Sequence, residues 1–133
     1  MQFIRYANLF NNVTKIICNH CFEYNNTIVF AVPKKLVAGA IGKDNINLEK
    51  LSKIIGKRIK IVAIPRGNED IESFASTLTR PVKFKAIELR GNEAIINAGA
   101  QSKASLIGKN KVRLVEMENI LDQYFGVKKV LIK

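Results

Sequence analysis

Two glycine–lysine pairs are the residues of this chain best suited to holding an anion. Gly42-Lys43 and Gly108-Lys109 each follow an isoleucine and precede an amphipathic stretch. A glycine lets the backbone turn sharply, so that backbone N–H groups can approach a phosphate, and the N-terminus of a following helix adds a favourable dipole. The sequence therefore predicts two phosphate-binding loops.

A nucleotide-hydrolysing P-loop does not account for these pairs. Such a loop needs Ser or Thr directly after the lysine to hold magnesium, and Asp44 and Asn110 occupy those positions. It also needs a glycine five positions before the glycine of the pair, where Val37 and Lys103 stand. No Asp or Glu pair has a spacing that suggests acid–base catalysis. We expect no enzymatic activity and no catalytic residues.

Cys18 and Cys21 form a Cys-x-x-Cys pattern, which raises the possibility of zinc or redox chemistry. We expect both cysteines within one strand, where residues three apart point to opposite faces. Two cysteines and one histidine are also too few for a closed four-ligand zinc site in one chain. The pattern favours buried structural cysteines, so we predict no metal and no cofactor.

Composition and charge indicate a globular protein with an anionic partner. The chain has 133 residues, of which 47% are hydrophobic, and its 22 Lys+Arg against 11 Asp+Glu give a formal net charge of +11. Such a balance is typical of nucleic-acid binding. Membrane-surface binding would need a basic amphipathic helix or a block of consecutive basic residues, and neither is present. We expect a soluble cytoplasmic protein without a membrane span or a signal peptide.

The sequence repeats itself. The segment from Ile41 to Ile55 aligns with the segment from Ile107 to Leu121, and every apolar position of the first has an apolar partner 66 positions later. We therefore expect two copies of one unit, residues 1–66 and 67–133, joined by a short linker at 65–70. So short a linker favours units packed as one rigid body.

Each copy is expected to have the element order α-β-β-α-α-β, which makes the chain an α+β protein. The first copy is predicted to contain a helix around 3–13, strands at 15–22 and 27–32, a short helix at 33–40, the loop at 42–45, a helix through 48–55 and a strand at 57–64. The second is predicted to contain a helix around 71–78, strands at 82–89 and 94–98, a short helix at 102–107, the loop at 108–111, a helix through 114–124 and a strand at 128–132. We expect the apolar faces of these helices to pack in the core, and the first helix, with the aromatic residues Phe3, Tyr6 and Phe10, is the best candidate for an exception that binds a partner.

Two motifs carry a resemblance to a known family. They are Ala40-Ile41-Gly42-Lys43, continued by Leu48-x-x-Leu51-x-x-Ile54-Ile55-Gly56-Lys57, and Leu106-Ile107-Gly108-Lys109, continued by Val112-Arg113-Leu114. Each copy resembles a KH domain of the prokaryotic type (type II), whose three-stranded mixed sheet packs against helices. Two of them in tandem resemble the archaeal NusA-like transcription termination/antitermination factors, and this resemblance covers nearly all of the sequence.

The resemblance implies binding of single-stranded RNA and a role in transcription termination, antitermination or elongation control. In such domains the loop clamps the backbone of about four nucleotides, while the bases lie against an apolar groove and an open strand edge. RNA polymerase or other transcription factors would be the protein partners, and we expect a monomer. Lys53, Lys57, Arg58 and Lys60 would steer the RNA in the first copy. With the two loops, the predicted RNA-binding residues are Gly42, Lys43, Asn45, Lys53, Lys57, Arg58, Gly108, Lys109, Asn110, Lys111 and Arg113.

Both loops depart from the Gly-x-x-Gly pattern of the family. Asn45 and Lys111 occupy the second glycine position, where a positive φ is expected; asparagine tolerates it, whereas a lysine there costs about 1 kcal/mol. Asp44 would repel a phosphate, so we rank the second loop as the better phosphate contact. The net charge favours the first copy as the stronger attractor of RNA, because residues 1–66 carry a net charge of +8 and residues 67–133 carry +3.

Two other functions are compatible with these residues. The same loops would serve an RNA-binding factor in ribosome assembly or RNA processing. The altered second glycines are also compatible with a protein-interaction module whose KH loops no longer bind RNA.

Overall fold

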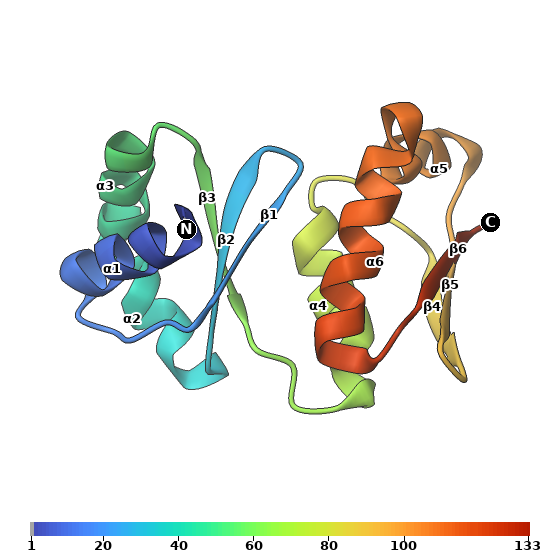
Figure 1. The fold of residues 1–133 in the computed structure, drawn as a ribbon, viewed down its shortest axis with the longest axis horizontal. Coiled ribbons are helices and arrows are strands. Elements are labelled where there is room, and N and C mark those ends of the chain that lie inside the picture. The colour runs from blue at the N-terminus through green and yellow to red at the C-terminus, as the bar shows by residue number, and fades with distance from the viewer. Residues whose placement is uncertain (1) are drawn as a thin grey trace. The chain divides into compact units, whose positions relative to one another are not determined.

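In the computed structural model, which describes residues 2–133, the chain is an α+β protein with two three-stranded mixed sheets (Figure 1). It divides into two compact units, Met1–Ile64 and Pro65–Lys133. The sequence predicted the boundary after residue 66, which is two residues beyond the boundary in the structure. Within residues 2–133, no helix combines the length and the apolar composition that a membrane crossing requires.

Both units have the predicted order of elements. The first contains α1 (Gln2–Thr14), β1 (His20–Tyr24), β2 (Thr27–Val32), α2 (Val37–Ile41), α3 (Ile46–Ile55) and β3 (Arg58–Ala63). The second contains α4 (Ile71–Thr79), β4 (Ala86–Arg90), β5 (Glu93–Asn97), α5 (Ala100–Ile107), α6 (Val112–Phe125) and β6 (Lys129–Ile132). Single 3-10 turns precede α2, α3, α4 and α6, at Lys34–Leu36, Lys43–Asn45, Asn68–Asp70 and Lys109–Lys111.

The two sheets share one topology. In the first unit β2 lies in the centre, antiparallel to β1 and parallel to β3, and in the second β5 lies between β4 and β6 in the same way. A parallel pair needs a crossover connection, which α2 and α3, or α5 and α6, supply. The loop that links the two crossover helices is the Gly-Lys loop in both units.

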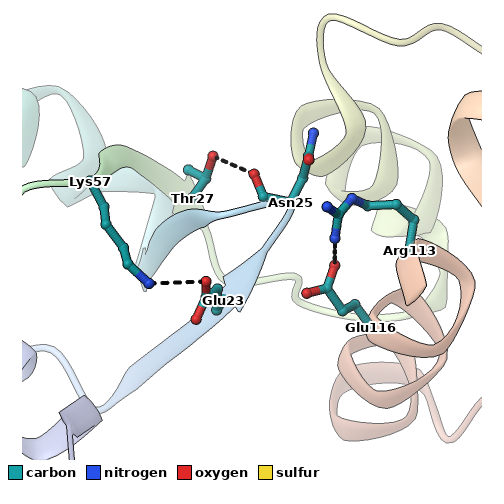
Figure 2. Close-up of polar contacts among 6 residues, drawn as sticks. All are labelled: Glu23, Asn25, Thr27, Lys57, Arg113 and Glu116. Atoms are coloured by element: carbon teal, nitrogen blue, oxygen red, sulfur yellow. Dashed lines mark hydrogen bonds and ion pairs between the residues drawn. The ribbon is translucent and has the colours of Figure 1, made fainter. Parts of the chain in front are cut away.

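Tight turns join the antiparallel strands. Asn25 and Asn26 both adopt positive φ, 53° and 57°, which matches the twist of a two-residue hairpin between β1 and β2. The Thr27 hydroxyl donates a hydrogen bond of 3.3 Å to the carbonyl of Asn25 (Figure 2). The turn lies in the gap between the two strands predicted at 15–22 and 27–32.

Two predicted strands begin later than expected. The segments 15–19 and 80–85 are connections, and the strands after them begin at His20 and Ala86. In the first unit α1 ends at Thr14, and Lys15 after it has a φ of 64°. The Thr14 hydroxyl accepts a hydrogen bond of 3.1 Å from the N–H of Ile16. This local turn uses backbone that an extended strand would need.

Large apolar side chains hold each unit together. In the first, Phe10 of α1 stacks on Phe30 of β2 with ring centroids 4.6 Å apart, and both are fully buried beside Ile28 and Leu51. Phe10 is therefore a core residue, whereas Phe3 is 41% exposed. In the second unit the buried set includes Phe74, Leu78, Ile96, Leu106, Met117, Leu121 and Val130.

We predict that Phe30→Ala destabilises the protein by about 3–5 kcal/mol, because it removes a buried ring and leaves a cavity under α1. Ile17→Ala is the control, since Ile17 is 75% exposed and its truncation should change stability by less than about 0.5 kcal/mol. Urea unfolding followed by circular dichroism measures both. Equal losses would contradict this description of the core.

Candidate nucleic-acid interface

The two Gly-Lys loops have the same backbone structure. Gly42 has φ 81° and ψ 165°, and Gly108 has φ 76° and ψ 169°. Each glycine N–H donates a hydrogen bond of 3.0 Å to the carbonyl four residues earlier, on Ala38 or Ala104, which closes the preceding helix. Each glycine carbonyl then accepts a hydrogen bond of 3.2 Å from the N–H of the residue three positions later. The repeat found in the sequence is thus a repeat of hydrogen bonds as well.

Only glycine fits at the first position of each loop. Its φ lies in the region that L-residues rarely adopt. A methyl group added at Gly42 would lie 2.9 Å from Cγ2 of Ile46, and one added at Gly108 would lie 2.6 Å from Cγ of Arg113. The following helix therefore packs directly on the glycine and fixes the direction of the loop.

Two consecutive residues at positive φ complete each loop. Asp44 and Asn45 have φ of 54° and 62°, and Asn110 and Lys111 have φ of 56° and 62°. As predicted, Asn45 and Lys111 adopt the conformation that the second glycine of the family pattern would provide. At Lys111 this conformation is a strain of about 1–2 kcal/mol.

The helices that follow the loops begin without side-chain caps. Asn45 and Lys111 are the N-cap residues of α3 and α6, and neither makes a side-chain cap hydrogen bond. The N–H groups of Ile46 and Val112 donate to the carbonyls of Lys43 and Lys109, and the other first-turn N–H groups lack the side-chain acceptor that Ser, Thr or Asp often supplies. With the positive end of the helix dipole, this is a favourable position for a phosphate.

Charge distinguishes the two loops. Lys43 and Asp44 are both exposed, so the first loop is locally neutral. Lys109 and Lys111 are both exposed on the second loop, where neutral Asn110 replaces the aspartate. Among the described residues, none of these three lysines takes part in an ion pair. The two loops thus have the same backbone conformation, but the first is neutral and the second carries two positive charges.

Arg113, predicted to contact RNA, is already engaged. Its side chain is only 20% exposed, and its guanidinium pairs with the carboxylate of Glu116 at 2.5 Å (Figure 2). Its aliphatic stem covers Gly108. Arg113 therefore positions the loop in this structure instead of offering a free charge. Sequence reasoning missed Glu116, although the i, i+3 spacing on a helix could have indicated the pair.

The basic residues of the first unit are also distributed among several roles. Lys57 forms an ion pair of 3.2 Å with Glu23 of β1, which ties the end of α3 to the sheet (Figure 2). Lys53 and Arg58 are exposed, and Lys60 is half-buried. Lys53 and Arg58 are thus the members of the predicted steering group with exposed side chains.

The cysteines are packed, but not as predicted. Cys18 precedes β1 instead of lying within it, so Cys18 and Cys21 both pack against the same core, and the expectation of opposite faces was wrong. The Cys18 thiol donates to the carbonyls of His20 and Ala31, at 3.2 and 3.4 Å. Burial raises the pKa of both thiols, that of Cys21 to about 12. At neutral pH they are therefore protonated and poorly reactive.

Within residues 2–133, no group of three or more His, Cys, Asp or Glu side chains gathers in a way that could hold a metal ion.

We predict that Lys111→Gly stabilises the protein by up to about 1 kcal/mol, because glycine removes the positive-φ strain. Lys109→Gly is a matched control, since it removes the same charge from the same loop at a residue whose φ is not positive. That change should cost about 0.5–1 kcal/mol of stability through the entropy of the unfolded chain. Thermal unfolding compares the two, and destabilisation by both would contradict the strain at Lys111.

Comparisons with known proteins identify a structural neighbour but no family. No protein-family model matches the chain, and no curated protein sequence matches it. Among solved structures, the crystal structure of APE1850 is similar, with 26% sequence identity and a TM-score of 0.67 over 99% of this chain and 98% of that chain. The name of that protein states no activity, ligand or partner. The similarity therefore extends over both units and supports the fold as a whole.

Proposed function

We propose that this chain is a cytoplasmic protein of two tandem type II KH domains that binds single-stranded RNA and acts in transcription termination, antitermination or elongation control. The observation that carries the proposal is the duplicated loop. In both units a glycine and two positive-φ residues lead into a helix whose N-terminus has no side-chain cap. Such a loop brings backbone N–H groups and lysines to a phosphate backbone.

Strain at Lys111 adds to this argument. Glycine would occupy the same position without cost, yet the chain carries a lysine there. Backbone strain in folded proteins tends to occur at functional sites, where another gain offsets it. A second lysine beside Lys109 supplies that gain if the loop holds a phosphate, because a charged donor strengthens the hydrogen bond.

The surroundings of the loops suit single strands better than duplexes. β3 and β6 are edge strands, so one side of each is not paired with another strand of its sheet. α2 and α3 pack beside β3, which places the loop, the helices and an open strand edge in one unit. Splayed bases of single-stranded RNA can form hydrogen bonds with such an edge, whereas the bases of a duplex are already paired.

The role in transcription rests on the resemblance of the two halves to NusA-like factors. RNA polymerase is the protein partner that this resemblance implies. Co-purification of the tagged chain with RNA polymerase, compared with ribosomal particles, tests this part of the proposal separately from RNA binding.

We predict that a fluorescent single-stranded RNA binds with an affinity that falls as salt rises, and that an unlabelled duplex of the same sequence competes poorly. Lys109→Gln with Lys111→Asn should weaken binding at least about tenfold, because hydrogen bonds from charged groups to phosphate are lost. The slope of log K against log salt should fall by about 1.4, since each contact to a single strand contributes about 0.7. Fluorescence anisotropy measures both quantities.

Lys34→Gln with Lys35→Gln is the matched control for that variant. It also removes two positive charges, from exposed positions in the turn before α2. Asparagine at 111 also eases the positive φ, so weaker binding cannot be attributed to an unstable loop. Equal losses of RNA affinity in the two double variants would show that binding depends only on the net charge of the protein, and would contradict the loop assignment.

A second prediction uses the difference between the loops. Asp44→Asn should strengthen RNA binding about fivefold, and Asn110→Asp should weaken it by a similar factor, because two unit charges about 4 Å apart in water interact by about 1 kcal/mol. Both positions have nearly the same φ and ψ, and Asn and Asp both tolerate that conformation. The same titrations measure the effect. Unchanged affinity in both variants would show that neither loop faces a phosphate.

A further inference from the structure

The connection from α4 to β4 contains basic and aromatic residues that take no part in the proposed function of the loops. Residues 80–85 read Arg-Pro-Val-Lys-Phe-Lys, and no acidic residue occurs between Glu72 and Glu88. In Figure 1 this segment leaves the end of α4 and leads to β4. Three cations and one aromatic ring are thus concentrated in six residues.

A cavity of about 240 Å³ opens beside this connection. Its wall consists of Ser76, Arg80, Val82, Lys83 and Phe84. Val82 and Phe84 are half-buried, whereas Arg80 and Lys83 are exposed. The cavity therefore combines an apolar part, which includes a phenyl ring, with a hydroxyl group and two positive charges.

Hydrogen bonds fix the connection at both ends. The N–H of Arg80 donates to the carbonyl of Ser76 at 3.1 Å, and the N–H of Val82 donates to the carbonyl of Thr79 at 2.9 Å. The buried Thr79 hydroxyl donates back to the carbonyl of Val82 at 3.1 Å. At the other end, the N–H of Lys85 donates to the carbonyl of Asn97 at 2.7 Å. A site held in this way loses little entropy when a ligand binds.

The first unit lacks this combination at the corresponding positions. Sixty-six residues before Arg80, Lys83 and Phe84 stand Thr14, Ile17 and Cys18. The shared fold therefore requires neither the two cations nor the ring. Their presence in the second unit calls for an explanation outside the packing of the fold.

We propose that this cavity binds one nucleotide of a single-stranded RNA. The base stacks on Phe84, the adjacent phosphate lies between Arg80 and Lys83, and the Ser76 hydroxyl forms a hydrogen bond with the base or the sugar. A simple anion would not use the ring, and a purely apolar ligand would not use the cations. A nucleotide uses both, and base–aromatic stacking is a general feature of single-strand binding. The identification of RNA as the source of this nucleotide rests on the proposed function.

A titration of the full chain with adenosine 5′-monophosphate, followed by NMR, tests the cavity without the loops. The expected result is chemical-shift change at Val82, Lys83 and Phe84. Inorganic phosphate at the same concentration should change the shifts of Phe84 far less. Equal changes with phosphate alone would overturn the proposal in favour of a simple anion site, and the absence of change at these residues would overturn it outright.

The second arm measures RNA affinity by fluorescence anisotropy. Phe84→Leu should weaken binding about five- to tenfold, whereas Phe84→Tyr keeps the ring and should restore it. Phe3→Leu, at an exposed phenylalanine of α1, is the matched control. Arg80→Gln with Lys83→Gln, compared with Lys34→Gln and Lys35→Gln, repeats the test at exposed positions.

The outcomes separate this inference from the proposed function. If RNA binds through the loops and the Phe84 and Arg80/Lys83 variants match their controls, the cavity proposal fails alone. If the nucleotide shifts Val82 to Phe84 while the chain binds no RNA, the proposed function fails and the cavity is a site for free nucleotides.

Discussion

The contact between each loop glycine and the helix that follows it is the constraint on which both units depend. Ile46 packs so closely on Gly42, and Arg113 on Gly108, that no side chain fits there. This contact directs the chain from α2 into α3, or from α5 into α6, and the pair of helices then returns the chain to the sheet. The crossover allows β3 to pair in parallel with β2, and β6 with β5. Fold and candidate site therefore share the same few residues, and a change at either glycine would affect both.

Because the glycine contacts fix the backbone, the two residues after each lysine are free to differ. The φ angles at 44 and 110 agree to within a few degrees, as do those at 45 and 111, although the side chains are Asp and Asn in one loop and Asn and Lys in the other. The second loop gains charge at the expense of backbone strain, and the first avoids strain and stays neutral. The two units thus provide an internal comparison in which geometry is constant and charge varies.

Much of this organisation could be predicted from the sequence, because apolar spacing and the repeat determine which elements form and in what order. The loops were also predicted, with their glycines and the positive φ of Asn45 and Lys111, whereas the positive φ of Asp44 and Asn110 was not predicted. The starts of β1 and β4 were also not predicted, because Ile16, Ile17 and Val82 are β-branched residues typical of strands. They lie in connections in which Thr14 bonds to Ile16 and Thr79 bonds to Val82. The Lys57–Glu23 pair joins residues 34 positions apart, and the cavity beside Phe84 depends on how α4 meets the next connection. Such features arise from tertiary packing, which one sequence does not reveal.

The ion pairs explain how the unit with the smaller net charge can contain the more positive loop. The second unit contains most of the acidic residues, but Asp70, Glu88, Glu116 and Asp122 all pair with nearby Arg or Lys side chains. Their charge is therefore compensated locally, and none of these pairs involves Lys109 or Lys111. In the first unit the excess of positive charge is spread over exposed residues such as Lys34, Lys35, Lys50 and Lys53. A distributed charge attracts a polyanion over about one Debye length, roughly 8–10 Å in physiological salt, whereas holding a phosphate requires contact. A strong field over the first unit and a strong contact at the second loop are consequently different contributions to the proposed binding of RNA, and a chain can have both.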